Sequence, residues 1–267
     1  MNSSAASWPA RSRSDVTTPI TVVPDAARLG EAVAQRILEQ LTTGSAIVGF
    51  PAGRSATPVA AALKESGASL DGLQIVMMDE YVTRQGSRWE LLDPHAPHSC
   101  IGWAERNLLG PLGLGPTSLL TPDPNEPEAF KQEILDRGGI DLFLLASGQG
   151  DGHVALNGPG TPRHAPTRVV ELPESTRRDN VSTFPNLQSP AEVPSYGVTI
   201  GTAELVELSH SAVMLLWGEN KAYAFDRITQ ADQYDPLWPA TIVHDCRNAF
   251  IYADEEAAQK SEREGVS

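Results

Sequence analysis

Hydrophobic residues in this chain fall into short continuous runs, separated by longer stretches in which apolar residues recur every three or four positions. Short continuous runs are typical of strands that are buried on both faces. We expect such strands at residues 20–23, 46–50, 73–78, 141–146, 212–217 and 249–252, with a weaker one at 169–172.

The stretches between the strands predict helices. The first follows Asp25, a residue type favoured at helix N-caps, and carries an apolar stripe from Leu29 to Leu41. Further helices are expected at 58–65, 99–109, 126–137, 203–208, 219–229 and 238–244, followed by an acidic C-terminal helix. Because buried strands alternate with amphipathic helices, the fold class predicted is α/β, a single-domain, mostly parallel sheet with helices on both faces.

Three polar segments are expected to lack regular structure. Residues 1–18 are rich in Ser, Thr, Pro and Arg and show no periodicity, so we interpret them as a disordered N-terminal tail. The segments 83–98 and 173–195 are polar, contain prolines and are interpreted as long loops. Residues 19–267 are then expected to form the single domain.

Charge and hydropathy narrow the classes of partner. The chain has 34 acidic and 20 basic side chains, a formal net charge of −14. Nucleic-acid binding needs a basic stripe, which this sequence lacks, so nucleic acid is excluded as a partner. No apolar run approaches the roughly 18–20 residues that span a bilayer, so no membrane association is expected. The first residues contain no apolar stretch of the signal-peptide kind, and we expect a cytoplasmic protein.

Cysteine and histidine usage gives little sign of a metal centre. The two cysteines, Cys100 and Cys246, are far apart in the sequence, which argues against a disulfide framework and a thiolate metal site. Asp93, His95 and His98 could ligate a metal, but an exposed loop is the favoured interpretation of this segment.

Three of the expected strands end in segments that carry reactive or ligand-binding side chains. They are PAGRSATP at 51–58, DEY at 79–81 and SGQGDGH at 147–153. In open parallel sheets, ligands bind outside the carboxyl ends of the strands. We therefore expect these three segments to converge on one cleft.

Each segment suggests a chemical role. The first offers a glycine, two hydroxyls and Arg54 before a helix, which suits a phosphate but is explained equally well by turn chemistry. In the second, a strand-end carboxylate could take a proton from a carbon next to a carbonyl, and Asp79 and Glu80 point different ways, so only one faces the ligand. In the third, Asp151 could fix the tautomer of His153, while three glycines allow close approach of the backbone.

Two motifs about 70 residues apart, DEY and DGHVALNGPG, resemble those of the glucosamine-6-phosphate deaminase/isomerase and 6-phosphogluconolactonase superfamily. The deaminase branch is more similar, because the chain also carries GFPAGRSATP, MMDEYV, STR at 175–177, VTIG at 198–201 and NKA at 220–222. The resemblance spans residues 20–253. It implies a Rossmann-like fold of the sugar-phosphate isomerase type.

The resemblance implies an aldose–ketose isomerase, or an isomerase/deaminase, that acts on a phosphorylated hexose or amino-hexose through an enediol-type intermediate. Asp79 would move the proton between C2 and C1, and His153, oriented by Asp151, would assist ring opening. The substrate phosphate would be held by Gly53, Arg54, Ser55, Thr57, Arg177 and Lys221. No metal or organic cofactor is implied. The expected partner is a small-molecule sugar phosphate, and formation of a homo-oligomer is left open.

Two features depart from the deaminase pattern. The glutamate of its NEPG motif is Gly158 here, and the phosphate loop is about two residues longer and contains Arg54. Two alternatives are therefore kept. One is a lactonase-like hydrolase, in which His153 activates water against a phosphosugar lactone. The other is a non-catalytic sugar-phosphate sensor, which is disfavoured because the expected N-terminal tail is too short for a DNA-binding helix-turn-helix.

Overall fold

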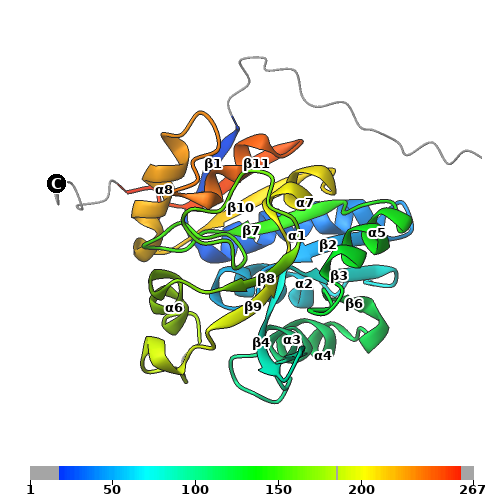
Figure 1. Ribbon diagram of the computed structural model, residues 1–267. Coiled ribbons are helices and arrows are strands. Elements are labelled where there is room, and N and C mark those ends of the chain that lie inside the picture. Colours follow the sequence, from blue (N-terminus) through cyan, green and yellow to red (C-terminus); the bar gives the residue numbers. More distant parts are fainter. Residues whose placement is uncertain (1–17, 185, 260–267) are drawn as a thin grey trace, which may run out of the picture.

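The computed structural model describes residues 18–184 and 186–259, and the strands in this part of the chain form two sheets. The larger has seven strands, all parallel to their neighbours, in the order β1-β11-β10-β7-β2-β3-β6 (Figure 1). The predicted parallel sheet is confirmed. Its strands are β1 (Ile20–Val23), β2 (Ala46–Phe50), β3 (Leu73–Met77), β6 (Leu119–Leu120), β7 (Leu142–Ala146), β10 (Ala212–Leu216) and β11 (Ala249–Asp254).

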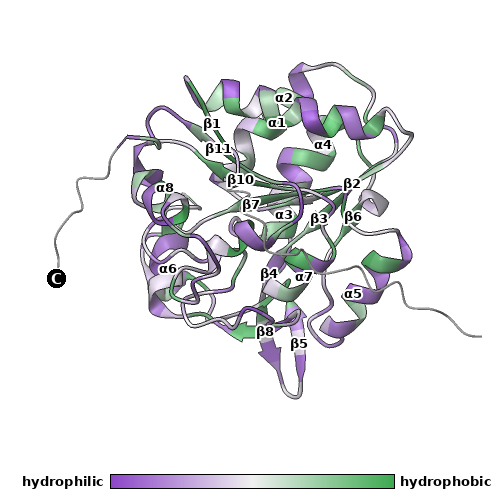
Figure 2. Cartoon of the chain, turned by 90° about the horizontal axis from the view of Figure 1, so that it is seen from above, coloured by the Kyte–Doolittle hydropathy of each residue, from purple (hydrophilic) through white to green (hydrophobic). Residues whose placement is uncertain are grey.

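Successive side chains of these strands point to opposite faces of the sheet, and a separate hydrophobic core covers each face. In β7, Leu142 and Leu144 belong to one core, whereas Phe143 and Leu145 belong to the other. Figure 2 shows mainly green strands in the central sheet and both green and purple positions on helices such as α5. One core includes residues of α1 (Ala26–Leu41), α2 (Thr57–Glu65) and α3 (Cys100–Ala104), and the other includes residues of α5 (Pro127–Asp136), α7 (Thr202–Glu207) and α8 (Ala222–Thr229).

Several helices begin where the sequence predicts. Asp25 caps α1 by accepting a hydrogen bond from the backbone N–H of Arg28 at 2.8 Å. The helix expected at 99–109 consists of α3 and a π-helical turn, Glu105–Leu109, and continues into α4 (Gly110–Leu112). The segment expected to be helical near 238–244 is a 3-10 helix, Pro239–Asp245. Among the helices described, none is both long and apolar enough to cross a bilayer.

A second, antiparallel sheet begins where β3 ends. Its order is β5-β4-β9-β8, built from β4 (Asp79–Gln85), β5 (Arg88–Leu91), β8 (Arg168–Glu171) and β9 (Tyr196–Thr199). Only Met78 separates β3 from β4, and its carbonyl accepts a hydrogen bond from the backbone N–H of Ile200 at 2.7 Å. The first residue of β4, Asp79, therefore lies at the junction of the two sheets.

The loop predicted at 83–98 is wrong for its first half, because β4 and β5 form a hairpin there. Gly86, with a φ of 62°, occupies the turn, and the ring of Trp89 packs against that of Tyr196 with 5.2 Å between centroids. Most side chains of the hairpin are exposed, so no alternation of buried and polar residues marks it in the sequence.

The loop predicted at 173–195 is also wrong in part, because it contains helix α6 (Glu174–Val181). The sequence of this helix, ESTRRDNV, has no apolar stripe, and the residues that it buries are the polar Thr176 and Asn180. The sequence of this helix therefore shows no hydrophobic periodicity that would predict it.

The chain ends differ from expectation where they are described. After β11, residues 255–259 form turns instead of beginning an acidic helix. The expected disordered tail lies outside the described residues, apart from residue 18. Strands β6 and β9 were not expected, since one is two residues long and the other follows a polar segment.

Candidate active site

The carboxyl ends of β2, β3, β7 and β10 surround one cavity. After β2 the chain adds β3 and β6 on one side and then returns to place β7 on the other side of β2, so the cavity lies where the strand order reverses. Residues of all three segments predicted to converge line it, among them Ser55, Asp79 and His153. Helix α6 and the segment after β10 supply further walls, and Cys100 of α3 and Leu156 also line the cavity.

Asp79 places a buried carboxylate in this cavity. It is 6% exposed, and burial raises its pKa to about 7. A hydrogen bond with the thiol of Cys100 opposes this rise, the nearby Glu80 adds to it, and His153 again opposes it. A carboxylate that titrates near neutral pH is suited to accept and return a proton.

Glu80 points away from the cavity and fixes helix α3. Its carboxylate is fully buried and accepts hydrogen bonds from the Ser99 hydroxyl at 2.6 Å and from the backbone N–H groups of Tyr81 (2.7 Å), Cys100 (3.1 Å) and Ile101 (2.8 Å). Burial raises the pKa of Glu80, against the effect of these four donors. The prediction that only one of the two adjacent carboxylates faces the cavity is confirmed.

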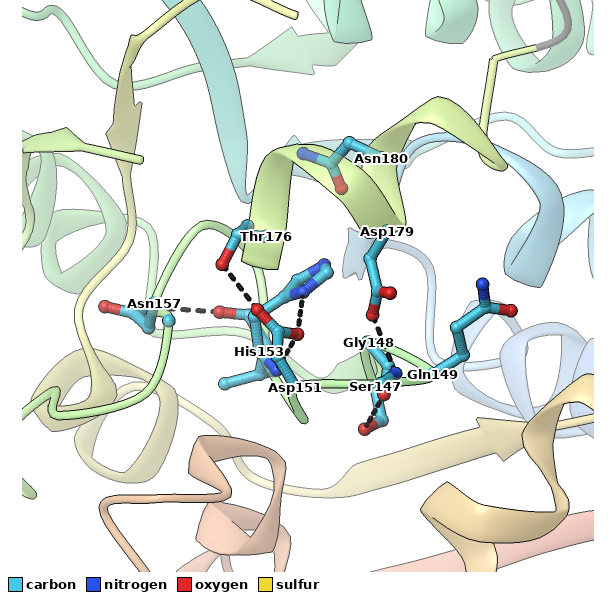
Figure 3. Close-up of polar contacts among 12 residues, drawn as sticks. Ser147, Gly148, Gln149, Asp151, His153, Asn157, Thr176, Asp179 and Asn180 are labelled. Atoms are coloured by element: carbon cyan, nitrogen blue, oxygen red, sulfur yellow. Dashed lines mark hydrogen bonds and ion pairs between the residues drawn. The ribbon is translucent and has the colours of Figure 1, made fainter. Parts of the chain in front are cut away.

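His153 and Asp151 form a bonded pair in the loop after β7 (Figure 3). His153 Nδ1 lies 2.7 Å from Asp151 Oδ1, which also accepts the backbone N–H of His153 at 3.1 Å. The second carboxylate oxygen of Asp151 accepts a hydrogen bond from the Thr176 hydroxyl of α6 at 2.6 Å. This arrangement assigns the Nδ1 proton to the bond with Asp151 and leaves Nε2 for the cavity that His153 lines.

The pair is electrostatically biased toward a carboxylate and an imidazolium. Burial acts to raise the pKa of Asp151, but His153 and the hydrogen bonds from His153 and Thr176 hold it well below its usual range. Burial acts to lower the pKa of His153, but the charge and hydrogen bond of Asp151, together with the charge of Asp179, raise it above its usual value. His153 can therefore carry a proton into the reaction at neutral pH.

Two glycines are required by the close packing of this loop. A Cβ at Gly148 would lie 2.3 Å from His153 Nδ1 and 2.4 Å from Asp151 Oδ1. Gly152 has a φ of 66°, and a Cβ there would lie 2.2 Å from the ring of Trp238. Gly148 therefore makes room for the Asp151–His153 pair, and Gly152 makes room for the ring of Trp238.

Cationic side chains lie along the β2 and β10 side of the cavity. Lys221 donates a hydrogen bond from Nζ to the carbonyl of Ser147, and burial lowers its pKa to about 8. The guanidinium of Arg54 lies 4.3 Å from the ring centroid of Trp217 and donates to Asn220 Oδ1 at 2.6 Å. Arg54 and Lys221 therefore give the cavity two cations that could hold an anionic group.

Ser55 also lines the cavity, but the remaining three predicted phosphate-binding residues, Gly53, Thr57 and Arg177, do not. Gly53, with a φ of 87°, is packed so closely that a Cβ would lie 2.3 Å from Thr183 Cγ2. Thr57 is exposed, and its hydroxyl donates to the carbonyl of Arg54 at 2.7 Å. Arg177 is half-buried on α6, and its Nε is buried with no hydrogen-bond partner among the described residues. Their contact with a phosphate stays a prediction.

Sequence reasoning missed several cavity residues. Cys100 begins α3, Asp179 and Asn180 lie on α6, Phe184 and Trp217 follow α6 and β10, and Asn220 lies in the NKA motif but was not named as a site residue. Asp179 and Asn180 were hidden because α6 has no hydrophobic period. The segment that carries them follows the STR motif directly, which is the one signal that could have identified it.

Among the described residues, one group of metal-ligating side chains comes together, formed by Asp151, His153 and Asp179, with one ligand atom of each within 4.8 Å of the others. Both oxygens of Asp151 accept hydrogen bonds, and Asp179 Oδ2 accepts the backbone N–H of Gly150 at 2.8 Å. Because these carboxylate oxygens already accept hydrogen bonds, the group is better suited to hold a histidine between two carboxylates than to bind a metal ion. Asp93 and His95, by contrast, lie in an exposed loop with 3.0 Å between His95 Nδ1 and Asp93 Oδ1.

The sequence is similar to those of known sugar-phosphate enzymes, although no family model matches it. The glucosamine-6-phosphate deaminase of Shouchella clausii is 34% identical over 224 residues, which cover 82% of this chain and 85% of that protein. The glucosamine-6-phosphate deaminase of Streptomyces avermitilis is 30% identical over 252 residues, or 90% of this chain and 92% of that protein. The glucosamine-6-phosphate isomerase of Candida albicans is 29% identical over 221 residues, or 79% and 85%.

Solved structures show the same fold in two kinds of enzyme. A monomeric glucosamine-6-phosphate deaminase superposes with a TM-score of 0.78 at 24% identity, over 90% of this chain and 98% of that one. The 6-phosphogluconolactonase of Leishmania guyanensis superposes with a TM-score of 0.65 at 16% identity, over 94% of this chain and 100% of that one. At these identities the likeness is one of fold, so it is the sequence relatives that favour the deaminase branch.

Proposed function

Because the chain belongs to the glucosamine-6-phosphate deaminase/isomerase family, we propose that it converts a 2-amino-2-deoxyhexose 6-phosphate and water into a ketohexose 6-phosphate and ammonia. The observation that carries the proposal is the position of Asp79. Its buried carboxylate, with a pKa raised to about 7, faces the same cavity as His153. One group suited to carbon–proton transfer and one suited to oxygen protonation thus share one binding space.

The first step is opening of the sugar ring. The C1–O5 bond breaks when O5 gains a proton and the C1 hydroxyl loses one, which leaves an aldehyde at C1. His153 is placed for this proton transfer, because Asp151 holds its Nδ1 and leaves Nε2 toward the cavity. The carboxylate of Asp151 stabilises the imidazolium between the two proton movements.

The second step moves a proton from C2 to C1. Asp79 takes the proton from C2, the electrons of that bond form the C1–C2 double bond of an enediol-type intermediate, and the C1 oxygen is protonated. Return of the proton to C1 leaves a C2 imine. Water adds to this imine, and ammonia departs to give the ketone. Burial of Asp79 is what makes its proton exchangeable near neutral pH.

The cationic side of the cavity would hold the phosphate. Arg54 and Lys221 approach from the segments after β2 and β10, and Asp79 enters from β4. Binding of a phosphate remote from the reacting carbons positions C1 and C2 for the transfer. Both cations reach the cavity from strands other than the one that leads to Asp79. Phosphate binding and proton transfer would therefore rest on different structural elements.

The test is to incubate the protein with glucosamine 6-phosphate, glucose 6-phosphate and 6-phosphogluconolactone in D2O, and to follow each by proton NMR. We expect ammonia release and deuterium at C1 of the ketose product from the amino sugar. Asp79→Asn should abolish both while sparing ligand binding. The exposed Asp136→Asn on α5 is the matched control and should be unaffected.

Two outcomes would contradict the proposal. Undiminished turnover by the Asp79→Asn variant would exclude Asp79 as the base. Lactone hydrolysis without exchange in either sugar would assign the chain to the lactonase reaction instead.

A further inference from the structure

Gly158 lies against the first turn of α6. A Cβ at this position would be 2.9 Å from Thr176 Oγ1 and 3.2 Å from Pro173 Cγ. A larger side chain at 158 therefore requires the Thr176 hydroxyl, which bonds Asp151, to shift. Position 158, where the deaminase pattern carries a glutamate, contributes no carboxylate near His153 in this chain.

Helix α6 supplies such a carboxylate. Thr176 and Asp179 are three residues apart, so they share one face of the helix. Thr176 bonds Asp151, and Asp179 lines the cavity with an oxygen within 4.8 Å of ligand atoms of both Asp151 and His153. Figure 3 shows both side chains reaching from α6 toward the loop that carries the pair.

The Asp179 side chain is held in this position by the loop itself. Gly150 donates its backbone N–H to Asp179 Oδ2 at 2.8 Å, and a Cβ at Gly150 would lie 3.1 Å from Asp179 Oδ1. The small residue at 150 thus lets the carboxylate come close. The hydrogen bond occupies Oδ2 and leaves Oδ1 for interactions in the cavity.

We propose that Asp179 is a positioning residue that keeps His153 in its protonated, ring-opening form, a role that Gly158 cannot fill. The proposal rests on the proposed function for the reaction that His153 serves. The charge interaction between the two residues exists without substrate, so it can be tested separately.

The groups around His153 act in opposite directions. Burial lowers the pKa of His153; Asp151 on its own loop and Asp179 on α6 raise it, and Lys221 lowers it. Asp79 of β4 also interacts with this imidazole. Asp151 acts through a direct bond and Asp179 through space, so removing the charge of Asp179 leaves the geometry of the bonded pair intact.

The experiment is a pH titration of the His153 ring by NMR in the substrate-free protein, with the signal assigned by its loss in His153→Gln. Asp179→Asn removes the charge but keeps an oxygen to accept the N–H of Gly150. We expect it to lower the pKa of His153 by about one unit. Asp179→Glu restores the charge and should return most of the shift. Glu174→Gln, which neutralises an exposed carboxylate on the same helix, should cause none.

In Asp179→Asn, the basic limb of the pH profile of kcat/KM for glucosamine 6-phosphate, where His153 loses its proton, should shift to lower pH by the same amount as the NMR titration. The acidic limb, set by Asp79, should stay at the same pH. An unshifted His153 in a folded Asp179→Asn variant would overturn the proposal, because a residue that only fixes Gly150 would give that result. If the amide spectrum shows that Asp179→Asn is misfolded, Asp179→Ser is titrated in its place. A shifted titration in a protein that turns over no sugar phosphate would support this inference and reject the proposed function.

Discussion

The carboxylate of Glu80 accepts a hydrogen bond from the Ser99 hydroxyl at 2.6 Å and so joins the first residues of β4 to the first turn of α3. Asp79 directly precedes Glu80 and Cys100 directly follows Ser99, and a hydrogen bond with the Cys100 thiol acts to lower the pKa of Asp79. The orientation of the proposed base therefore depends on a neighbour that never meets the cavity.

Glu80→Gln should destabilise the protein. Four donors converge on the two carboxylate oxygens, and an amide would place its own N–H donors against some of them. We expect the free energy of unfolding to fall by about 2 kcal/mol, measured by urea denaturation. Glu90→Gln, exposed on β5, is the control and should stay within about 0.5 kcal/mol of wild type. Equal stability of the two variants would contradict this account of Glu80.

Asp79→Asn should stabilise the protein above neutral pH. Burial raises the pKa of Asp79 from 3.8 to about 7, so the folded state keeps a proton that the unfolded chain has already released. The stability tied to that proton is complete below the unfolded pKa and is lost as pH rises through about 7. The asparagine variant is neutral at every pH and avoids the loss.

Unfolding at two pH values measures this effect. At pH 8, Asp79→Asn should exceed wild type by roughly 2–4 kcal/mol, and near pH 4 the two should agree. If the wild type had the higher free energy of unfolding at pH 8, burial of the ionised Asp79 carboxylate would not be destabilising, which would contradict this account.

Lys221→Gln should weaken binding of a phosphorylated sugar more than it slows the chemistry. A charge-assisted contact with phosphate would be lost, and we expect KM to rise about 10- to 100-fold with a smaller change in kcat. Steady-state kinetics with Lys64→Gln, exposed on α2, provides the comparison. A fall in kcat at constant KM would assign Lys221 to the reacting carbons instead.

Gly148→Ala should disrupt the Asp151–His153 pair. The added Cβ would lie 2.3 Å from His153 Nδ1, so the ring or the loop has to move. We expect kcat/KM to fall at least about 100-fold, because small misplacements of a proton donor are costly. Gly115→Ala adds a methyl group where the nearest atom is 3.9 Å away and should leave kcat/KM unchanged. Wild-type kinetics for both variants would mean that the loop tolerates the shift.

Sequence reasoning succeeded where chemistry and hydrophobic pattern coincide. Asp79 and His153 each follow a strand whose apolar run is unmistakable, and the ends of parallel strands meet at one edge of the sheet. The position of both residues at one cavity could be predicted from these facts alone.

It failed where polar contacts hold the structure. Helix α6 buries Thr176 and Asn180, which bond Asp151 and the hydroxyl of Tyr81, respectively. Those bonds reach across 25 and 99 residues of sequence, and no local pattern encodes them. Asp179 could not be placed at the cavity before its helix was known.

The hydrogen bond from Thr176 to Asp151 couples the position of α6 to the charge of the cavity. Apolar contacts of a helix do not depend on the protonation of neighbouring groups. The hydrogen bond from Thr176 does, because it is strengthened by the negative charge of Asp151. Protonation of that aspartate, or its displacement by a ligand, would loosen one anchor of the helix. The rate of amide hydrogen exchange along residues 174–181 would then depend on whether the cavity is occupied.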